Sequence, residues 1–367
     1  MMPRRVRSAV TTFAVIANAI TVIAAVTTGY SGCFDAAAHP FISCSGLVFP
    51  FFILANIFFL VFWIIFQWRG AVIPLAGFAA CFPPMREYCP VNIPADPPSD
   101  AIQVFSMNVM DFNFSVPEDS IDALHTVVRY LKRSKPDIAC FQEVPQNRSK
   151  WEMLRETGRH TAEVSNSNGK LIFMTSRFKV IGSELIPYDA GGNMSAAFHL
   201  LIHGDTVTVV ANHLQSYKLS EEERSEVEKI ISGSGSRNLR NRENKLITEK
   251  LVNATRERAA QVKAVCHYID SLKAGGRSII VCGDFNETPI SYSHHEMDKR
   301  LNDCYTATAT GPGFSYEQNG MHFRIDHIFC SSDWVPHRCQ VIDRLRASDH
   351  YPMRCWLKKK RQAIKNE

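Results

Sequence analysis

Several short apolar segments, which are expected to be buried strands, end in polar side chains that could do chemistry. The clearest is VCGDFNETP (281–289), in which the β-branched run 278–282 leads into Gly283, Asp284 and Asn286. Because side chains alternate along a strand, Asp284 and Asn286 lie on the same side of the chain. Alone, the stretch fits a turn equally well, since Gly, Asp, Asn and Pro are the usual turn residues.

The same arrangement recurs at five other expected strands. The polar residues at or near their ends are Asn108, Gln142-Glu143, Asn212-His213, Arg324 with Asp326 and His327, and Ser348-Asp349-His350. Each has a structural interpretation of its own; His213 could be a core histidine, and Asp326 could pair with Arg324. Since ligand sites in α/β proteins form beyond strand ends, the repetition predicts one convergent site.

The residue types restrict the chemistry of such a site. Carboxylate and amide oxygens without a cysteine cluster favour a hard divalent cation, Mg²⁺ or Mn²⁺, over Zn²⁺. The sequence contains no Walker-type or GxGxxG loop and no GxSxG elbow, which argues against nucleotide-cradling folds and acyl transfer. Two histidines, several acids and a cation fit hydrolysis at phosphorus by activated water.

Alternating strands and helices must position these residues. The expected strands are 102–109, 137–143, 171–175, 198–203, 206–211, 278–282, 323–330 and 354–357. A helix is expected over 120–135, capped by Ser120 and ended by Pro136, and residues 218–275 should be mostly helical. Gly204-Asp205 is a hairpin signal. Helices mixed with parallel and antiparallel strands predict an α/β domain with mixed sheets over 101–358.

The first 84 residues are expected to form a transmembrane anchor of two to three helices. Uncharged apolar runs cover 8–28, 46–68 and, more briefly, 71–82. A cleaved signal peptide is the alternative for the first run, but its length and the second run disfavour it. The basic N-terminus favours the cytoplasmic side, the loop 29–45 without Lys or Arg favours the outside, and Arg69 then lies inside.

The number of spans decides where the large domain lies. Two spans would leave it in the cytoplasm, whereas three would place it on the outer, periplasmic side of the plasma (inner) membrane; we favour three. Residues 85–100 are rich in proline and are expected to be a stiff, extended linker, and 359–367 form a basic tail. Cys33 and Cys44 flank the outer loop and could pair, while Cys140 and Cys282 are expected to be buried free thiols.

Six motifs in order resemble one known family. They are FSMNV (105–109), FQEV (141–144), NHLQS (212–216), GDFNETP (283–289), RIDHI (324–328) and SDHYP (348–352). Together they resemble the endonuclease/exonuclease/phosphatase superfamily of DNase I-like nucleases, apurinic endonucleases, neutral sphingomyelinases and inositol polyphosphate phosphatases. With its apolar N-terminus the chain looks most like bacterial membrane-anchored members. The resemblance implies a four-layer sandwich of two mixed β-sheets flanked by helices.

The resemblance also implies a metal site. Glu143 would be the main ligand of Mg²⁺, with Mn²⁺ as a possible substitute, and Asn108 would lie beside it on the metal or the phosphate. Asp349 would lie close to the metal. No other cofactor is implied.

The catalytic roles are carried over in the same way. Asp284 would orient and deprotonate the attacking water, and Asn286 would help to hold that water and the phosphate. His350 would contact the scissile phosphate, oriented by Asp326, and His213 would donate to a phosphate oxygen. One departure is His327, where the family often has an aromatic residue; it should point away from Asp326, so we interpret it as structural.

Three functions remain open. The favoured one is a membrane-tethered, Mg²⁺-dependent phosphoesterase for a phospholipid or another non-nucleic-acid ester, such as an inositol or sugar phosphate. The second is a nuclease that uses basic residues such as those in 237–242, although the net charge of +5 is mild for a nucleic-acid enzyme. The third, an inactive membrane scaffold, predicts a lost catalytic residue, and none is lost. The insertion 217–250 could be a solvated helical excursion or a lid, and no protein partner is inferable.

Overall fold

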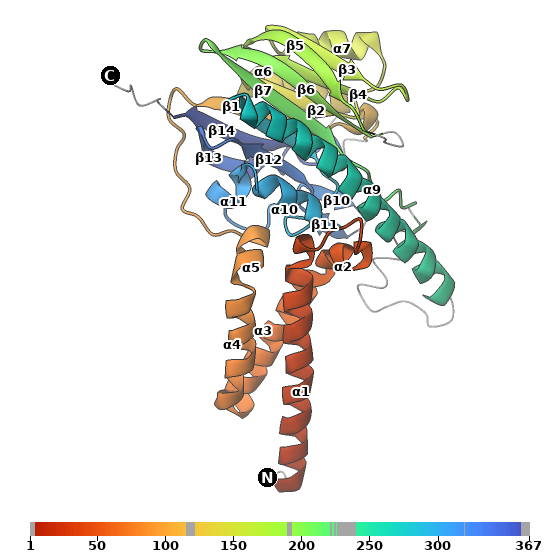
Figure 1. Ribbon diagram of the computed structural model, residues 1–367, viewed down its shortest axis with the longest axis vertical. Coiled ribbons are helices and arrows are strands. Elements are labelled where there is room, and N and C mark those ends of the chain that lie inside the picture. The colour runs from red at the N-terminus through yellow and green to blue at the C-terminus, as the bar shows by residue number, and fades with distance from the viewer. Residues whose placement is uncertain are drawn as a thin grey trace.

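The protein is described here by a computed structural model that covers residues 4–114, 122–188, 193–220, 222–223, 225, 240–318 and 320–360. A helical N-terminal segment, the candidate anchor, leads to a layered domain of strands and helices (Figure 1). Residues 221, 224 and 226–239 of the 217–250 insertion, part of the 237–242 basic cluster and the tail beyond residue 360 lie outside the described residues.

The first sheet has six strands within the described residues. In spatial order they are β13 (Trp334–Val341), β14 (Met353–Lys359), β1 (Ile102–Asn108), β2 (Ile138–Gln142), β4 (Leu171–Ser176) and β3 (His160–Ser165). The pair β1 and β2 is parallel, and the other neighbours are antiparallel.

The second sheet also has six strands in the described part of the chain. In spatial order they are β5 (Lys179–Ile186), β6 (Met194–Ile202), β7 (Asp205–His213), β8 (Ser278–Asp284), β12 (Asp326–Cys330) and β9 (Asn302–Asp303). Here β7 and β8 form the parallel pair. A separate hairpin joins β10 (Tyr316–Gln318) to β11 (Met321–Phe323).

The two sheets pack face to face between layers of helices. Their shared core contains Val104 and Ile138 from the first sheet and Val209 and Ile280 from the second. The outer face of the first sheet is covered by α6 (Ala123–Ser134) and α7 (Arg148–Arg155), and that of the second by α9 (Arg240–Ala274) and α10 (Tyr292–Asp298). This confirms the predicted four-layer α/β sandwich. The short helix α11 (Cys304–Thr308) packs beside β13.

Each parallel pair is joined by a helix, which sets the position of the polar strand ends. Helix α6 connects β1 to β2, and α9 connects β7 to β8. In the ladders Asn108 lies opposite Gln142, and His213 lies opposite Asp284. Because parallel strands end at the same edge, each crossover brings two of the predicted site residues together.

Three local predictions need correction. Helix α6 is capped by Asp122, whose side chain accepts from the His125 N–H, and not by Ser120, which lies outside the described residues. The hairpin turn is His203-Gly204 and not Gly204-Asp205, because a tight turn matching the strand twist needs positive φ at both central residues, here 51° and 93°.

The third correction concerns the segment 323–330, predicted as one strand. It divides into β11, which ends at Phe323, and β12, which begins at Asp326, and the two belong to different sheets. Between them the side chain of Ser315 accepts hydrogen bonds from the N–H groups of Ile325 and Asp326. A side chain therefore takes the place of a neighbouring strand at this point.

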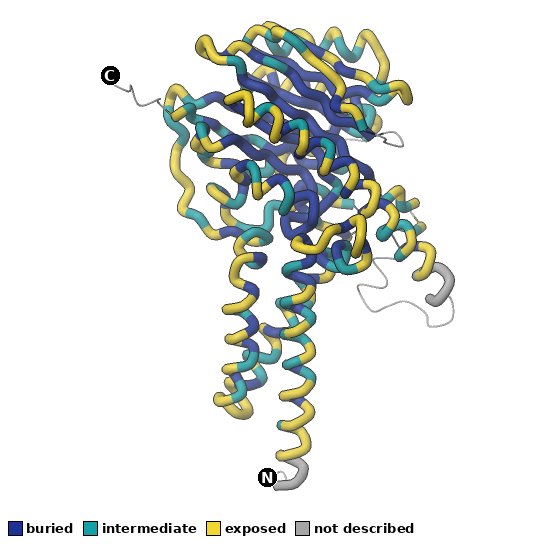
Figure 2. Tube along the Cα trace, viewed as in Figure 1, coloured by how far each residue is buried: buried dark blue, intermediate teal, exposed yellow. Residues whose placement is uncertain are grey.

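The anchor consists of helices that run up and down beneath the domain (Figure 1). They are α1 (Arg4–Gly29), α2 (Pro40–Cys44), α3 (Phe49–Phe66), α4 (Val72–Ala80) and α5 (Phe82–Tyr88), with short 3₁₀ turns at Ser31–Cys33, Ser45–Val48 and Trp68–Ala71. Two stretches, Ser8–Gly29 and Pro40–Phe66, are long and apolar enough to cross a bilayer. Many residues of these helices are exposed, large apolar ones among them, whereas the inner strands of the sheets are buried (Figure 2).

The predicted linker 85–100 is only partly extended. Helix α5 continues to Tyr88, because Pro83 and Pro84 occupy the first turn, where a helix needs no backbone donor. The extended part is attached to the domain by Asn92, whose side chain donates to the carbonyls of Thr306 and Ala309.

The cysteines are free thiols. Cys140 and Cys282 are buried in strands, as predicted, but the proposed pairing of Cys33 with Cys44 is wrong. The two residues are held in separate turns, and the Cys44 thiol instead donates to the carbonyl of Phe41.

A buried ion pair fixes α10 to β9 and makes stability depend on pH. Nε2 of His294 lies 3.0 Å from Oδ2 of Asp303, and both side chains are 2% exposed. Burial alone would raise the pKa of Asp303, but His294 holds that pKa below its ordinary value of 3.8. Burial would likewise lower the pKa of His294, but Asp303 holds it above the ordinary 6.5.

We expect this pair to stabilise the fold most between the two ordinary values. The Asp303 contribution is complete above 3.8 and is lost as the pH falls towards its lowered folded pKa, whereas the His294 contribution is complete below 6.5 and is lost as the pH rises through its raised folded pKa. Asp303→Asn keeps the cap on α11 but removes the charge, and should cost about 3–5 kcal/mol. Thermal unfolding in detergent at several pH values measures this, and a wild-type-to-variant difference that does not change with pH would contradict it.

Candidate active site

The carboxyl ends of the two parallel pairs meet in the space between the sheets. Nδ2 of Asn108 donates to Oε1 of Glu143 at 3.0 Å and to Oδ2 of Asp284 at 3.1 Å, so one amide links both sheets. Nε2 of His213 lies 3.1 Å from Oε1 of Glu143 and 3.9 Å from Oδ2 of Asp284. Four residues far apart in sequence thus form one contact network.

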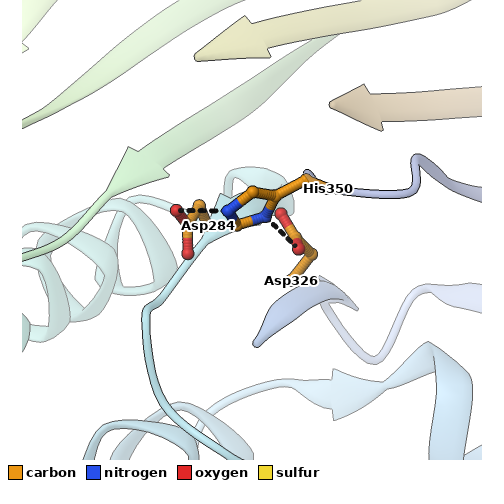
Figure 3. Close-up of side chains that lie close together, drawn as sticks. All are labelled: Asp284, Asp326 and His350. Carbon is orange, nitrogen blue, oxygen red and sulfur yellow. Dashed lines mark hydrogen bonds and ion pairs between the residues drawn. The ribbon is translucent and has the colours of Figure 1, made fainter. Parts of the chain in front are cut away.

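A second group approaches Asp284 from the other side. Nδ1 of His350 lies 2.9 Å from Oδ2 of Asp326, and its Nε2 lies 3.8 Å from Oδ2 of Asp284 (Figure 3). The imidazole ring therefore stands between two carboxylates. All three side chains are almost fully buried. The ring of Tyr316 packs on His350 with its centroid 5.1 Å away.

Asp284 is also the first residue of a turn, so the GDFNETP motif (283–289) is both a turn and part of the site. Its Oδ1 accepts from the N–H of Asn286 at 2.8 Å, and its Oδ2 accepts from Nδ2 of Asn286 at 3.0 Å. Before it, Gly283 has a φ of 129°, and a Cβ there would lie 2.1 Å from the carbonyl oxygen of Asn212. Glycine is therefore required for β8 to place Asp284 beside His213.

Unusual backbone conformations cluster around this network. Non-glycine residues with positive φ there are Met110, Asp111, Phe112, Glu143 and Asn286. The strand ends hold these conformations through hydrogen bonds, because Asp111 N–H donates to the Glu143 carbonyl and Met110 N–H donates to Oδ1 of Asn108. Such conformations cost energy and persist where the surroundings fix them, which is common at active sites.

The pKa values of the buried site residues indicate which groups can accept a proton and which can donate one. Burial raises the pKa of Asp284 to about 6, helped by the Asp326 charge and opposed by the two histidines. Burial would lower the pKa of His350, but Asp326 and Asp284 raise it to about 10. His350 is thus a cation at neutral pH and can donate a proton or a hydrogen bond, while Asp284 can accept a proton near neutrality.

Glu143 and His213 form the other half of this charge pattern. Burial would raise the pKa of Glu143, but hydrogen bonds from His213 and Asn108 hold it well below the ordinary value. Burial would lower the pKa of His213, but Glu143 and Asp284 raise it. Glu143 is therefore ionised at neutral pH. Its side chain is 24% exposed, compared with 1% for Asp284, so it is the more open of the two.

The donor set fits a divalent cation of the Mg²⁺ type. The carboxylates of Glu143, Asp284 and Asp326 supply hard oxygen ligands, and Oδ1 of Asp326 is buried without a hydrogen-bond partner. The amide of Asn108 turns its nitrogen to Glu143 and Asp284 and its oxygen to the Met110 N–H. Ligand atoms of Asp284, Asp326 and His350 all lie within 4.8 Å of one another. A cation among these three would displace the hydrogen bond between His350 and Asp326 and face a charged imidazole. The open carboxylate of Glu143 beside Asn108 is the better position.

The structure brings together seven of the eight predicted site residues through direct contacts. Asp349 differs, since its carboxylate accepts from the hydroxyl of Ser348 and it acts on the network through its charge, which raises the pKa of the adjacent His350. His327 is buried beneath the loop that follows β8 (285–291, here called the catalytic loop of the candidate site), where its Nε2 lies 2.9 Å from the Glu287 carbonyl oxygen. That contact fits the structural interpretation of His327.

Sequence reasoning missed the residues that hold the catalytic loop. The guanidinium of Arg258 on α9 lies 2.9 Å from Glu287 and donates to the Gln215 carbonyl, and its side chain has no exposed surface. Ser315 holds the start of β12, and Asn193 donates to the Leu214 carbonyl. Glu287 lay within the GDFNETP motif, which was a usable signal; Ser315 and Asn193 follow no sequence pattern.

Comparison with known proteins agrees with this geometry. The sequence model of the Endonuclease/Exonuclease/phosphatase family matches residues 112–350, and a Domain of unknown function (DUF8431) matches residues 11–88. No curated protein matches the sequence. The human Nocturnin catalytic domain with a bound sulfate anion is similar in fold, with a TM-score of 0.52 and 16% identity over 72% of this chain and 97% of that one.

Two further solved structures share lower similarity. An endonuclease/exonuclease/phosphatase from Bacteroides vulgatus has a TM-score of 0.49 and 17% identity over 71% of this chain and all of its own. D. rerio TDP2 complexed with a single-strand DNA product has a TM-score of 0.48 and 15% identity, over 71% of this chain and 100% of that one. The family match extends over most of the layered domain and includes the catalytic motifs from Glu143 to His350. The chain belongs to the endonuclease/exonuclease/phosphatase family.

Proposed function

We propose that this protein is a membrane-anchored hydrolase of phosphoesters that requires a divalent cation, Mg²⁺ or Mn²⁺. The observation that supports it best is the position of Asp284, which contacts Asn108 and lies within 3.9 Å of both His213 and His350. A buried carboxylate between two histidines, next to a second, more open carboxylate, suits the activation of water beside a bound phosphate.

Each residue has a distinct role in this proposal. Glu143 holds the cation with Asn108, and Asp349 lies nearby; the cation supplies charge neutralisation at the phosphate when it is bound. Asp284 orients the water and accepts its proton, and Asn286 helps to hold the water and the phosphate. The imidazolium of His350, kept in place by Asp326, and that of His213 donate hydrogen bonds to phosphate oxygens.

We further propose that the anchor crosses the membrane three times. Asn18 on α1 and Asn56 on α3 share a buried hydrogen bond of 2.9 Å, and Trp63 donates to Asn18, so α1 is packed as a permanent helix rather than a removable signal. The loop after α1 touches the catalytic domain, and so does the end of α5. Both must lie on one side of the bilayer, which requires α4 and α5 to form a third crossing.

The positive charges support an outer position for the catalytic domain. The start of α1, whose sequence contains Arg4, Arg5 and Arg7, lies at the end of the helices away from the domain (Figure 1). The turn Trp68–Ala71, which contains Arg69, follows Gln67, and Gln67 contacts Thr11 near that end of α1. Positive residues favour the cytoplasmic side. We expect an alkaline phosphatase fused to the C-terminus, which is active only outside the cytoplasm, to be active, and a fusion after Arg69 to be inactive. The reverse pattern would refute the topology.

A lipid or another non-nucleic-acid phosphoester is the favoured substrate. The anchor keeps the domain at the bilayer, where phosphoester headgroups are concentrated, and the net charge of +5 is small for a nuclease of this size. A membrane-tethered nuclease is the second candidate. A plasmid-nicking activity that falls steeply with salt would favour it over the lipid enzyme.

The cation requirement is tested with Glu143→Gln in the full-length chain. The change removes the charge that attracts the cation but keeps the size and a hydrogen-bond acceptor. We expect hydrolysis of a soluble phosphodiester to need at least about tenfold more Mg²⁺ for half-maximal rate, as loss of support at a metal site typically costs. EDTA should abolish wild-type activity.

The matched control is Glu184→Gln, the same change at an exposed carboxylate on β5. It should leave the Mg²⁺ dependence of the rate unchanged. Activity of the wild type that persists in EDTA, or a Glu143→Gln enzyme with the wild-type Mg²⁺ dependence, would refute the proposed role of Glu143.

A further inference from the structure

The first extramembrane segment of the anchor lies directly against the loop that follows the catalytic strand β8. Ser31 and Gly32 are buried, and the hydroxyl of Ser31 lies 3.4 Å from the carbonyl oxygen of Ile290. A Cβ on Gly32 would lie 2.6 Å from the carbonyl oxygens of both Ile290 and Ser291. The backbone of Gly32 therefore contacts the backbone of Ile290 and Ser291 directly, and no side chain would fit between the anchor and the domain at this point.

This segment also contributes to the core beneath the catalytic loop. Ala36 is buried in one cluster with Phe285 and Tyr292, which lie on either side of Asn286 and the turn that follows. At its edge Asp35 pairs with Lys263 of α9 at 2.9 Å. The residues just after Asp284 thus pack directly against the anchor.

A second attachment joins the end of α5 to the catalytic strand β12. The guanidinium of Arg324, which is 2% exposed, donates to the carbonyls of Glu87 and Pro312 and lies over the ring of Tyr305. Unsatisfied carbonyls at a helix C-terminus bind cations well. Arg324 is two residues before Asp326, so the last turn of the anchor is tied to the strand that positions His350.

We propose that the anchor acts as a clamp, which means that it holds the catalytic domain rigidly and does not only link it to the membrane. Residues 31–48 and the last turn of α5 fix the catalytic loop and β12 over the bilayer. The site therefore acts on phosphoesters carried by lipids of the same membrane. The proposal rests on the proposed hydrolase function and names its substrate class. A site held at one height meets headgroups at a high effective concentration, whereas a released domain samples a larger volume.

Both attachments must be loosened to test this. The released variant combines three changes: Gly32→Val removes the close backbone contact, Arg324→Met removes the hydrogen bonds to the α5 carbonyls, and a flexible Gly/Ser insertion after Pro98 lengthens the chain between Asn92 and β1. The matched control is Ala38→Val with the same insertion, since Ala38 lies in the same segment but is exposed. A further variant, Arg324→Met, releases the α5 attachment on its own.

The full-length variants are reconstituted in phosphatidylcholine vesicles that contain either phosphatidylglycerol or a phosphatidylinositol phosphate. Turnover of each lipid is compared with that of its dihexanoyl form, which is dissolved and monomeric. We expect the wild type to prefer the membrane form, and the released variant to lose about tenfold or more of the membrane rate while keeping the soluble rate. The Ala38→Val control should behave as the wild type.

Equal membrane rates for the released variant and the control would overturn the clamp. Turnover of plasmid DNA or of the dissolved esters in preference to both membrane lipids would overturn the lipid assignment while leaving the hydrolase intact. A wild type that hydrolyses no phosphoester with Mg²⁺ would instead refute the proposed function, together with this inference. Thermal unfolding of each variant shows whether a lost membrane rate reflects release or unfolding.

Discussion

Asp284→Asn should lower kcat/KM for a soluble phosphodiester by about 10²–10⁴-fold, the range that general bases supply. Asparagine has the shape of aspartate and keeps an oxygen for the N–H of Asn286, so the turn after β8 can persist. It cannot take a proton from water, and it removes the charge that both histidines face. The substitution should therefore lower the rate without unfolding the protein. Steady-state kinetics measures the rate, and thermal unfolding measures the stability.

The control is Asp343→Asn, the same chemical change at an exposed residue after β13. It should keep the wild-type kcat/KM. If Asp284→Asn retained more than a tenth of the wild-type value while folded, Asp284 would not be the base. Glu143 would then have to account for the activation of water.

The strands that carry the site could be predicted because their sequences are unambiguous. β1, β2, β4 and β8 are buried on both faces and read as continuous apolar runs, so their predicted ends are correct within two residues. Strands β3, β5 and β13 were missed, because they lie at sheet edges, where exposed and buried residues mix without a clear period.

The parallel pairing that unites the site was not visible in the sequence. That β1 pairs with β2, and β7 with β8, depends on how the α6 and α9 crossovers pack, which residue order alone does not show. The predicted site residues were found because polar residues at the ends of buried strands are costly unless they are used. Their supports, such as Ser315, are ordinary loop residues, and long-range packing gives them their role.

The same limit applies to the anchor. Hydropathy located α1 and α3, since a run of about 20 apolar residues has few other uses in a chain. It left the third crossing open, because α4 and α5 are short and interrupted at Cys81. We infer the third crossing from the contacts of Ser31 and Arg324 with other parts of the chain, at separations of more than 200 residues.

Substitutions at Asp326 and His350 should have the second large effect on the rate. They also distinguish two explanations of the cluster of Asp284, Asp326 and His350, which is either a catalytic pair beside a base or a set of metal ligands. If the two residues act as one hydrogen-bonded unit, Asp326→Asn and His350→Gln should each lower kcat by about 10²–10³-fold. The double variant should lose no more than the more damaging single one, because residues that act as a unit are not additive. Steady-state kinetics of the three variants measures this coupling.

The Mg²⁺ dependence of the rate decides between a catalytic pair and a set of metal ligands. A hydrogen-bonded pair leaves the half-maximal Mg²⁺ concentration of Asp326→Asn near the wild-type value, while Glu143→Gln raises it. A cation held by Asp284, Asp326 and His350, whose ligand atoms lie within 4.8 Å of one another, predicts the opposite order. The imidazole of His350 already lies between the two carboxylates, 2.9 Å from Asp326 and 3.8 Å from Asp284, and a cation there would have to displace it. We therefore expect Glu143→Gln to show the larger shift.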